Sequence, residues 1–250
     1  MPQPNDLRLN RFLARSGLGS RRNVERLILD RRIRINGEIV EDLGRRVDPN
    51  LDEVLCDGRP VALPESWRVY AFHKPVGVVS SLRKHGEVPC LADARTEAAL
   101  GDAVVPVGRL DADTSGLLLW TDDGFLAEQL MLPRHRIWKR YEVTLNNPLS
   151  AEDATRIRES AIELDGRPCL PASLEQRGAD DRDWDLALRE GRNRQIRRMF
   201  RAVGLRVTAL RRIAVGPIQL ADLAPGAFRK LGETEIELLR QAIAEAQDDG

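Results

Sequence analysis

The sequence predicts an α+β fold, with a small N-terminal domain of helices and strands and a larger domain built on a mixed, largely antiparallel sheet. Near the N-terminus, apolar residues recur at helical spacing and then alternate around an Asn-Gly pair. Beyond residue 66, strand-like and helix-like segments mix without the regular alternation of a doubly wound fold. The 250 residues, 42% of them hydrophobic, suffice for one large domain or two smaller ones.

Two short helices and a hairpin are predicted in the first domain. Apolar residues at helical spacing indicate a helix over residues 7–14, which the Ser-Gly-Leu-Gly run then breaks. Ser20 is placed to act as N-cap of a second helix over residues 21–30. Residues 33–40 alternate around Asn-Gly, the strongest short signal for a hairpin.

A linker is predicted at residues 60–66, where two prolines lie close together. The first domain then spans residues 1–59 and the second spans residues 67–250.

The second domain is predicted to alternate irregularly between strands and helices. Strands are expected at residues 69–72, 104–107, 117–120, 139–145, 162–164, 169–172, 184–188, 207–213 and 218–220. Helices are expected at residues 124–132, after an N-cap at Ser150, at residues 193–204, and after a capping box at residues 234–237. Residues 82–102 read as a loop.

The most informative stretch lies between two apolar runs, at residues 108–116. Gly108 and Gly116 bracket a turn in which unusual backbone angles are inexpensive, and the turn carries Asp111 and Asp113. Two readings are open for an Asp-x-Asp turn: a polar turn with exposed aspartates, or two strands that present a reactive carboxylate between them.

The wider pattern favours the second reading. Residues 108–124 read Gly-Arg-Leu-Asp-x-x-Thr-x-Gly-Leu-Leu-Leu-x-Thr-x-Asp-Gly, which resembles the catalytic motif of ribosomal pseudouridine synthases of the RsuA/RluB type. Lys74-Pro75-x-Gly77 resembles a second signature of that family. Residues 7–54 resemble the small RNA-binding domain named after ribosomal protein S4. The resemblance implies a central mixed sheet and an isomerase that acts on ribosomal RNA.

The resemblance implies three catalytic residues. Asp111 matches the catalytic aspartate, which either attacks the ribose as a nucleophile or removes a ribose proton. Tyr141, in a Lys-x-Tyr pattern, would stack on the flipped base. Arg197, in a Gln-Ile-Arg segment, would keep the aspartate ionised by charge pairing. Arg194 stands where related synthases often have histidine, and Asp113 is expected to shape the turn.

Basic residues gather at the N-terminus and again around residues 189–212, which suits nucleic acid although the net charge is zero. The alternative interpretation is that these arginines lie on a solvated surface and bind no nucleic acid. Arg109 is expected to fill the gap left by the flipped base. The residues expected to contact RNA are Arg21, Arg22, Arg26, Arg34, Lys74, Arg109, Arg192, Arg194 and Arg198.

No metal or other cofactor is expected, because Cys56, Cys90 and Cys169 form no ligand motif and the implied reaction needs none. No apolar run approaches membrane-spanning length, and no signal peptide is evident, so a cytoplasmic location is expected. The expected partner of a monomeric enzyme is ribosomal RNA, with the large subunit favoured, either free or in a pre-ribosomal particle.

Two other functions are compatible with parts of the sequence. Residues 110–114 also resemble the Asp-x-Asp-x-Thr motif of magnesium-dependent haloacid-dehalogenase-type phosphatases, but the acidic pair after residue 179 follows no buried strand. A non-catalytic RNA-binding assembly factor would not need Asp111, Tyr141 and Arg197 together.

Overall fold

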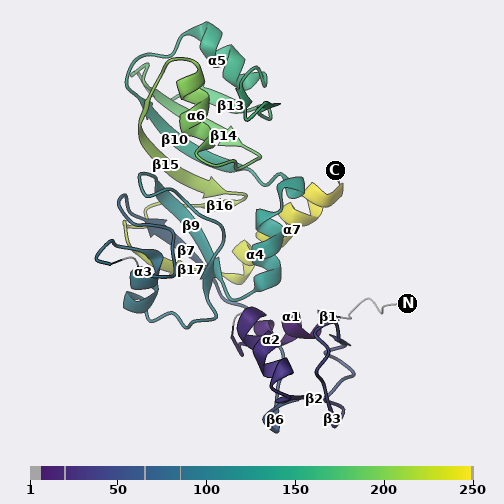
Figure 1. The fold of residues 1–250 in the computed structure, drawn as a ribbon. Helices are drawn as coiled ribbons and strands as arrows, with labels where there is room; N and C mark the ends of the chain where they lie inside the picture. The colour runs from purple at the N-terminus through teal and green to yellow at the C-terminus, as the bar shows by residue number, and fades with distance from the viewer. Residues whose placement is uncertain (1–6, 20, 65, 85, 249–250) are drawn as a thin grey trace. The chain divides into compact units, whose positions relative to one another are not determined.

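The computed structural model describes residues 7–19, 21–64, 66–84 and 86–248. These residues form two compact units (Figure 1). The first contains the chain through Arg68 together with Gly101–Val105 and Thr121–Gly124, and the second contains the remainder.

The first unit is built from two helices, a two-stranded pair and a four-stranded antiparallel sheet in the order β3-β2-β5-β6. Its elements are β1 (Leu7–Arg8), α1 (Leu9–Arg15), α2 (Arg21–Leu29), β2 (Ile33–Ile35), β3 (Glu38–Ile39), β4 (Arg46–Val47), β5 (Val54–Cys56) and β6 (Arg59–Pro60). The apolar faces of both helices pack on the strands, with Phe12, Val24 and Ile33 in one buried cluster. The N-cap predicted at Ser20 lies outside the described residues.

The predicted linker is displaced in the structure. Pro60 pairs with Leu55 as part of β6, and the Val61 N–H donates to the Val54 carbonyl. Proline is tolerated here because β6 is an edge strand. Residues 60 and 61 therefore belong to the first unit's sheet.

One large sheet organises the second unit. Among the described residues nine strands join it, in the order β13-β14-β10-β15-β9-β7-β17, with β16 on β15 and β8 on β9. The β15–β9 pair is parallel, whereas β15 pairs with β10, and β10 with β14, in antiparallel fashion. The strands are β7 (Val69–Lys74), β8 (Val105–Pro106), β9 (Ser115–Thr121), β10 (Lys139–Leu145), β13 (Ser173–Gln176), β14 (Asp183–Leu188), β15 (Val207–Val215), β16 (Ile218–Gln219) and β17 (Phe228–Lys230). The mixed, largely antiparallel sheet is thus confirmed.

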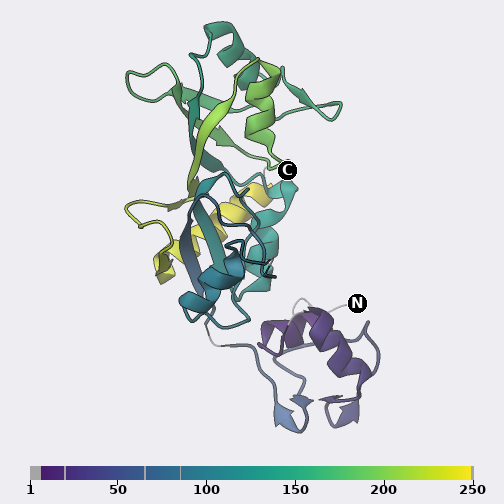
Figure 2. The same ribbon diagram turned by 60° about the vertical axis from the view of Figure 1, so that its left-hand side comes forward.

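Two apolar clusters lie on the two halves of this sheet. One joins β10, β14 and β15 to α5 and α6, and the other joins β7 and β9 to α4 and α7. Figure 1 shows this division, and α4 and α7 lie side by side in both views (Figure 2). The remaining elements are α3 (Leu91–Glu97), α4 (Gly124–Met131), the 3-10 helix η1 (Pro133–His135), α5 (Ala151–Arg158), the hairpin β11 (Glu163–Leu164) and β12 (Arg167–Pro168), α6 (Gln195–Ala202) and α7 (Glu233–Asp248).

Several local predictions are confirmed and others are wrong. Ser150 caps α5, accepting from the Asp153 N–H at 3.1 Å. The loop predicted over residues 82–102 contains α3, because the Asp93 carboxylate accepts from the Cys90 N–H at 3.0 Å, a cap without the usual Ser or Thr. The strand expected over residues 169–172 instead lies at β13.

The capping box predicted at residues 234–237 is also wrong, by two residues. The Glu235 carboxylate, rather than that of Glu237, reaches back to the Gly232 N–H at 3.1 Å. Arg229 holds the same carboxylate, so α7 starts at Glu233.

Gly116 lies where the two halves of the sheet meet. It pairs with Arg212 across the parallel β9–β15 contact and has φ +107°. A Cβ atom built there would lie 2.2 Å from the Arg212 carbonyl oxygen. Since that oxygen belongs to the backbone of a central strand, no side-chain rotation can relieve the clash.

Gly116→Ala is therefore expected to cost at least about 3 kcal/mol of stability, because the sheet must open at its centre. Gly178→Ala is the matched control: it also has positive φ, but no atom lies within 4 Å of the added Cβ. Thermal melting of both variants checks this. Equal melting temperatures for the two variants would mean that the sheet accommodates the methyl group.

Candidate active site

A cavity of about 400 Å³ opens on the second unit, and the central Asp-x-Asp loop forms part of its wall. The Val107 N–H donates to the Leu119 carbonyl at 2.7 Å, where β8 pairs with β9. The loop then turns, with the Thr114 N–H on the Asp111 carbonyl at 3.1 Å. Asp111 lines the cavity, and its side chain remains 35% exposed. Two strands thus present a carboxylate between them, as one reading of the sequence anticipated.

The end of β7 and the segment that follows it support this loop by donating hydrogen bonds to the carbonyl of every second loop residue. Ser80 Oγ donates to the Leu110 carbonyl at 2.6 Å, and the Gly77 N–H donates to the Ala112 carbonyl at 2.7 Å. Lys74 Nζ donates to the Thr114 carbonyl at 2.9 Å. Three carbonyls on both sides of Asp111 are therefore fixed by residues 74–80, two of them by the Lys-Pro-x-Gly segment itself.

Lys74 was predicted to contact RNA, and the structure contradicts this. The residue is fully buried, and its ammonium donates to the Pro75 and Thr114 carbonyls. Burial lowers the pKa of Lys74 to about 8, although the charges of Asp113 and Asp111 act in the opposite direction. The ammonium group of Lys74 therefore holds the loop in place, because a buried donor must pair with buried carbonyls and cannot reach solvent-exposed phosphates.

Two guanidinium groups face the two aspartates of the loop. Arg194 lies 2.9 Å from the Asp113 carboxylate and 3.5 Å from that of Asp111. Arg197 lies 3.2 Å from the Asp113 carboxylate and donates to the Asp113 carbonyl at 2.7 Å. The hydrogen bond from Arg194 lowers the pKa of Asp113.

The expected Arg197–Asp111 ion pair is thus replaced by a different pairing. Arg197 binds Asp113, and Arg194 is the cation that reaches Asp111. Helical geometry explains the exchange. Arg197 lies in the first turn of α6 and also donates to the Val207 carbonyl, whereas Arg194 precedes the helix in a left-handed conformation with φ +47°.

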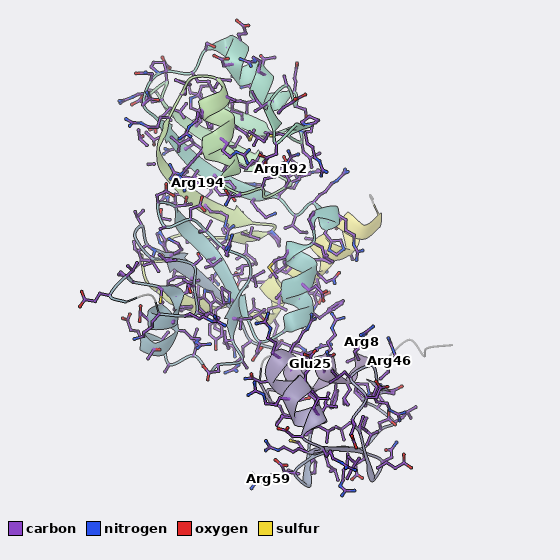
Figure 3. All side chains as sticks on the ribbon, viewed as in Figure 1. Arg8, Glu25, Arg46, Arg59, Arg192 and Arg194 are labelled. Carbon is purple, nitrogen blue, oxygen red and sulfur yellow. The ribbon has the colours of Figure 1, made fainter. Side chains whose placement is uncertain are left out.

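Arg192 and Arg198 were predicted to contact phosphates, but both are bound within the protein. Arg192 donates to the carbonyls of Leu164, Arg167 and Pro168 on the β11–β12 hairpin. Arg198 makes two hydrogen bonds to the Asp165 carboxylate at the tip of the same hairpin. These two guanidinium groups therefore anchor the hairpin to the start of α6, next to which Figure 3 labels Arg192 and Arg194.

The floor of the cavity comes from neighbouring strands. Tyr141 on β10 is only 9% exposed and belongs to the apolar core, yet it lines the cavity with Asp111 and Arg197. Arg109 also lines the cavity and is exposed, and it has no hydrogen bond or ion pair to any residue the structure describes. The cavity thus brings together all three predicted catalytic residues and Arg109.

Two cations of the cavity were not assigned a role from the sequence. Lys139 and Arg212 line it together with Tyr141. Lys139 stood in the Lys-x-Tyr pattern that marked Tyr141. For Arg212 the sequence offers only the alternation of side chains along the strand predicted at residues 207–213. That alternation does not show whether Arg212 or its neighbour Arg211 faces the cavity.

The described residues contain no group of three or more His, Cys, Asp or Glu side chains that could hold a metal ion. Within the same part of the chain, no helix has the length and apolar character needed to cross a membrane.

Residues 68–202 match the RNA pseudouridylate synthase family, and residues 7–52 match the S4 domain. Because the first match covers more than half of the chain, the protein belongs to the RNA pseudouridine synthase family, a class of isomerases. The family, the α+β fold and the enzyme class expected from the sequence are confirmed, and neither the phosphatase nor the non-catalytic alternative receives support.

Individual relatives agree with this assignment. An uncharacterised RNA pseudouridine synthase of Mycobacterium tuberculosis is 37% identical over 244 residues, covering 96% of each chain. Ribosomal large subunit pseudouridine synthase B of Bacillus subtilis is 33% identical over 237 residues, covering 93% of this chain and 95% of the relative. A crystal structure of a pseudouridylate synthase superposes with a TM-score of 0.65 at 33% identity, over 93% of this chain and 99% of that one.

The role of Lys74 in supporting the loop can be tested with Lys74→Met, which keeps the length of the side chain but removes its donors. We expect single-turnover pseudouridine formation to fall about tenfold or more, because a buried carbonyl that loses its donor costs ~1–3 kcal/mol and the loop relaxes. RNA affinity is expected to stay within about twofold, since the residue is buried. Lys84→Met, at an exposed lysine, is the control.

The pH dependence gives a second readout. The pKa of Lys74 in the folded protein, about 8, lies below its ordinary value of 10.5. Between these two pH values the unfolded chain still holds the Lys74 proton that the folded protein has lost. The stability of the wild type relative to Lys74→Met is therefore expected to rise between pH 8 and about pH 10. If the stabilities of the wild type and of Lys74→Met change with pH in the same way, Lys74 is not a buried lysine. If the variant loses activity and RNA affinity equally, Lys74 does not act by supporting the loop.

Proposed function

We propose that the protein isomerises a specific uridine of ribosomal RNA to pseudouridine, with the large subunit as the source of the substrate. The observation that carries the proposal is the convergence of Asp111, Tyr141 and Arg109 on one cavity beside a carboxylate-binding arginine, Arg194. The names of relatives support the large subunit, including synthase B of Bacillus subtilis. Such a substrate fits a cytoplasmic monomer that acts on RNA or on a pre-ribosomal particle.

The reaction breaks the bond between N1 of uracil and C1′ of ribose and forms a bond from C5 to C1′. N1 gains a proton and C5 loses one, so there is no net oxidation and no other reactant. Asp111 is proposed as the group next to the ribose, either attacking C1′ or removing a ribose proton. Both roles require an ionised carboxylate, and the guanidinium of Arg194 lies 3.5 Å from the Asp111 carboxylate.

The other cavity residues are proposed to hold the RNA in its reactive conformation. Tyr141 offers a ring face to the flipped uracil, and stacking of this kind contributes about 1–3 kcal/mol per base. Arg109, which has no partner among the described residues, is free to enter the space vacated by the base. Arg197 is proposed to fix the loop through Asp113, and through it the position of Asp111.

The first unit is proposed to bind RNA phosphates through α2. Val24 and Ile28 face its core, which leaves Arg22 and Arg26 exposed on one face at i, i+4 spacing. Arg21 and Arg34 are exposed nearby in the sequence. Guanidinium groups at such positions bind phosphate oxygens without reading base identity.

Asp111→Asn tests the proposed chemistry, because it preserves size but removes the charge. We expect pseudouridine formation to vanish in a single-turnover assay while RNA affinity is retained. In cells that lack the protein, one pseudouridine of large-subunit RNA is expected to disappear, and the wild type but not Asp111→Asn should restore it. Loss of a small-subunit site instead would reassign the substrate, and turnover by Asp111→Asn would exclude this aspartate as the reactive group.

The N-terminal arginines are tested by changing Arg22 and Arg26 together to Gln. Each lost contact to a single-stranded phosphate is expected to lower the slope of log affinity against log salt by about 0.7, so two contacts give about 1.4. The rate at saturating enzyme should stay unchanged. Arg32→Gln is the control, because Arg32 is already paired with Asp57. A slope equal to that of the wild type would make Arg22 and Arg26 solvated surface residues.

A further inference from the structure

Two cations on the floor of the cavity have no acidic partner. Arg212 is 6% exposed, and its Nε donates to the Leu117 carbonyl at 2.7 Å. Lys139 is half-buried, and its Nζ donates to the Ile137 carbonyl at 3.1 Å. Within the described part of the chain, neither side chain forms an ion pair. They differ in this respect from Arg192, Arg194, Arg197 and Arg198, each of which has a carboxylate partner.

An irregularity in the sheet places Arg212 in the cavity. Arg140 pairs with Ala214 and Tyr141 pairs with Arg212, so Ile213 is an extra residue in β15. Such a bulge changes which side chains share a face. Arg212 and Val215 accordingly both line the cavity although they are three residues apart, an odd spacing that a regular strand would send to opposite faces.

Two desolvated cations side by side are unfavourable without a negatively polarised partner. Burial, together with the nearby charge of Arg212, lowers the pKa of Lys139 to about 8. A buried charge is costly unless it is paired, and unpaired charges of this kind concentrate at functional sites. A ligand with electron-rich oxygen atoms would compensate the unpaired positive charge of Lys139 and Arg212.

The apolar surroundings favour a planar base over a phosphate as that ligand. Val107, Leu119 and Val215 line the same cavity, and Tyr141 adds a ring face. When the bond between N1 and C1′ breaks, its electron pair remains with the base. The resulting negative charge spreads over N1 and the two carbonyl oxygens of uracil, which are acceptors for N–H donors.

We propose that Lys139 and Arg212 bind the carbonyl oxygens of the target uracil and stabilise the negative charge that the base carries while it is detached from the ribose. This role deepens the proposed function and rests on it. Charge on the base returns to neutral once C5 has bonded to C1′, C5 has lost its proton and N1 has gained one. The pair therefore binds the detached base more strongly than the substrate or the product, which is the condition for accelerating the chemical step.

The experiment compares Lys139→Met and Arg212→Met with the charge-preserving variants Lys139→Arg and Arg212→Lys. The controls are Arg140→Met and Arg211→Met, at exposed neighbours on the same two strands. The single-turnover rate at saturating enzyme and the RNA affinity across a salt series are measured on an RNA that contains the target uridine. We expect each Met variant to lose about 10²–10³ in rate, as for removal of one donor to a developing anion.

The other variants and the salt series are equally informative. The charge-preserving variants should recover at least about a tenth of the wild-type rate, and the controls should match the wild type. The salt slope should not change in any of them. A slope lower by about 0.7 with an unchanged rate at saturation would make the residue a phosphate contact and overturn the proposal.

A substrate with a better leaving group separates charge stabilisation from mere packing. Fluorine at C5 withdraws electrons and stabilises the detached anion, so 5-fluorouridine at the target position needs less help from the protein. Loss of 5-fluorouridine from the RNA, followed by nuclease digestion and chromatography, should show a defect in the Met variants at least about tenfold smaller than with uridine. An equal defect on both substrates would assign the residues a structural role.

Failure of the proposal is distinct from failure of the proposed function. If the wild type forms no pseudouridine on any ribosomal RNA, the function itself is wrong. If the wild type is active and Asp111→Asn is inactive, but Lys139→Met retains the full rate on uridine, only the role of the cationic pair is excluded. Lys139→Met decides alone should Arg212→Met fail to fold, because Lys139 is the less buried of the two.

Discussion

The close contact between Gly116 and Arg212 is the constraint on which the second unit depends. It joins β9 to β15 in parallel, and these two strands connect halves of the sheet that carry separate apolar clusters. The absence of a side chain at Gly116 lets the backbones approach, while the Arg212 side chain reaches from the same pair into the cavity and bonds the Leu117 carbonyl. One pair of residues thus fixes both the sheet and the cavity floor. A glycine at this position of the motif is required by strand packing, not by the chemistry of the base.

The loop that carries Asp111 is fixed by hydrogen bonds to the carbonyls of Leu110, Ala112 and Thr114. All three donors lie within residues 74–80, at the end of β7 and just after it. Asp113 takes up the guanidinium groups of Arg194 and Arg197. Main-chain bonds and the second aspartate therefore provide the rigidity, which leaves the Asp111 carboxylate partly exposed in the cavity with a cation at 3.5 Å. Precise positioning of a reactive group by its supporting residues is a general requirement of catalysis.

Sequence reasoning succeeded where the pattern has a single physical explanation. The strand at Lys139–Leu145 and the cap at Ser150 follow from local chemistry, and the motif around Asp111 identified the loop and the family. It failed where one residue type can serve two purposes. A guanidinium or ammonium group binds phosphate and backbone carbonyl equally well, so the fully buried Lys74 looked like an RNA contact and holds the loop instead. Arg192 and Arg198 hold the β11–β12 hairpin, and their contact with RNA stays a prediction. Helix α3 was missed because Cys90 stands where Ser or Thr would mark the cap.

The distribution of paired and unpaired charge explains how a protein of zero net charge can attract RNA to this cavity. Around α6 the arginines are largely neutralised by Glu190, Asp113 and Asp165, so that helix contributes little free positive charge. The cavity instead is lined by cations that form no ion pair with any described residue, among them the exposed Arg109 and, at the floor, Lys139 and Arg212. A low-dielectric floor strengthens the field of the buried pair, whereas the exposed Arg109 is screened by salt. The cavity therefore combines buried positive charge at its floor, beside Tyr141, with the exposed positive charge of Arg109.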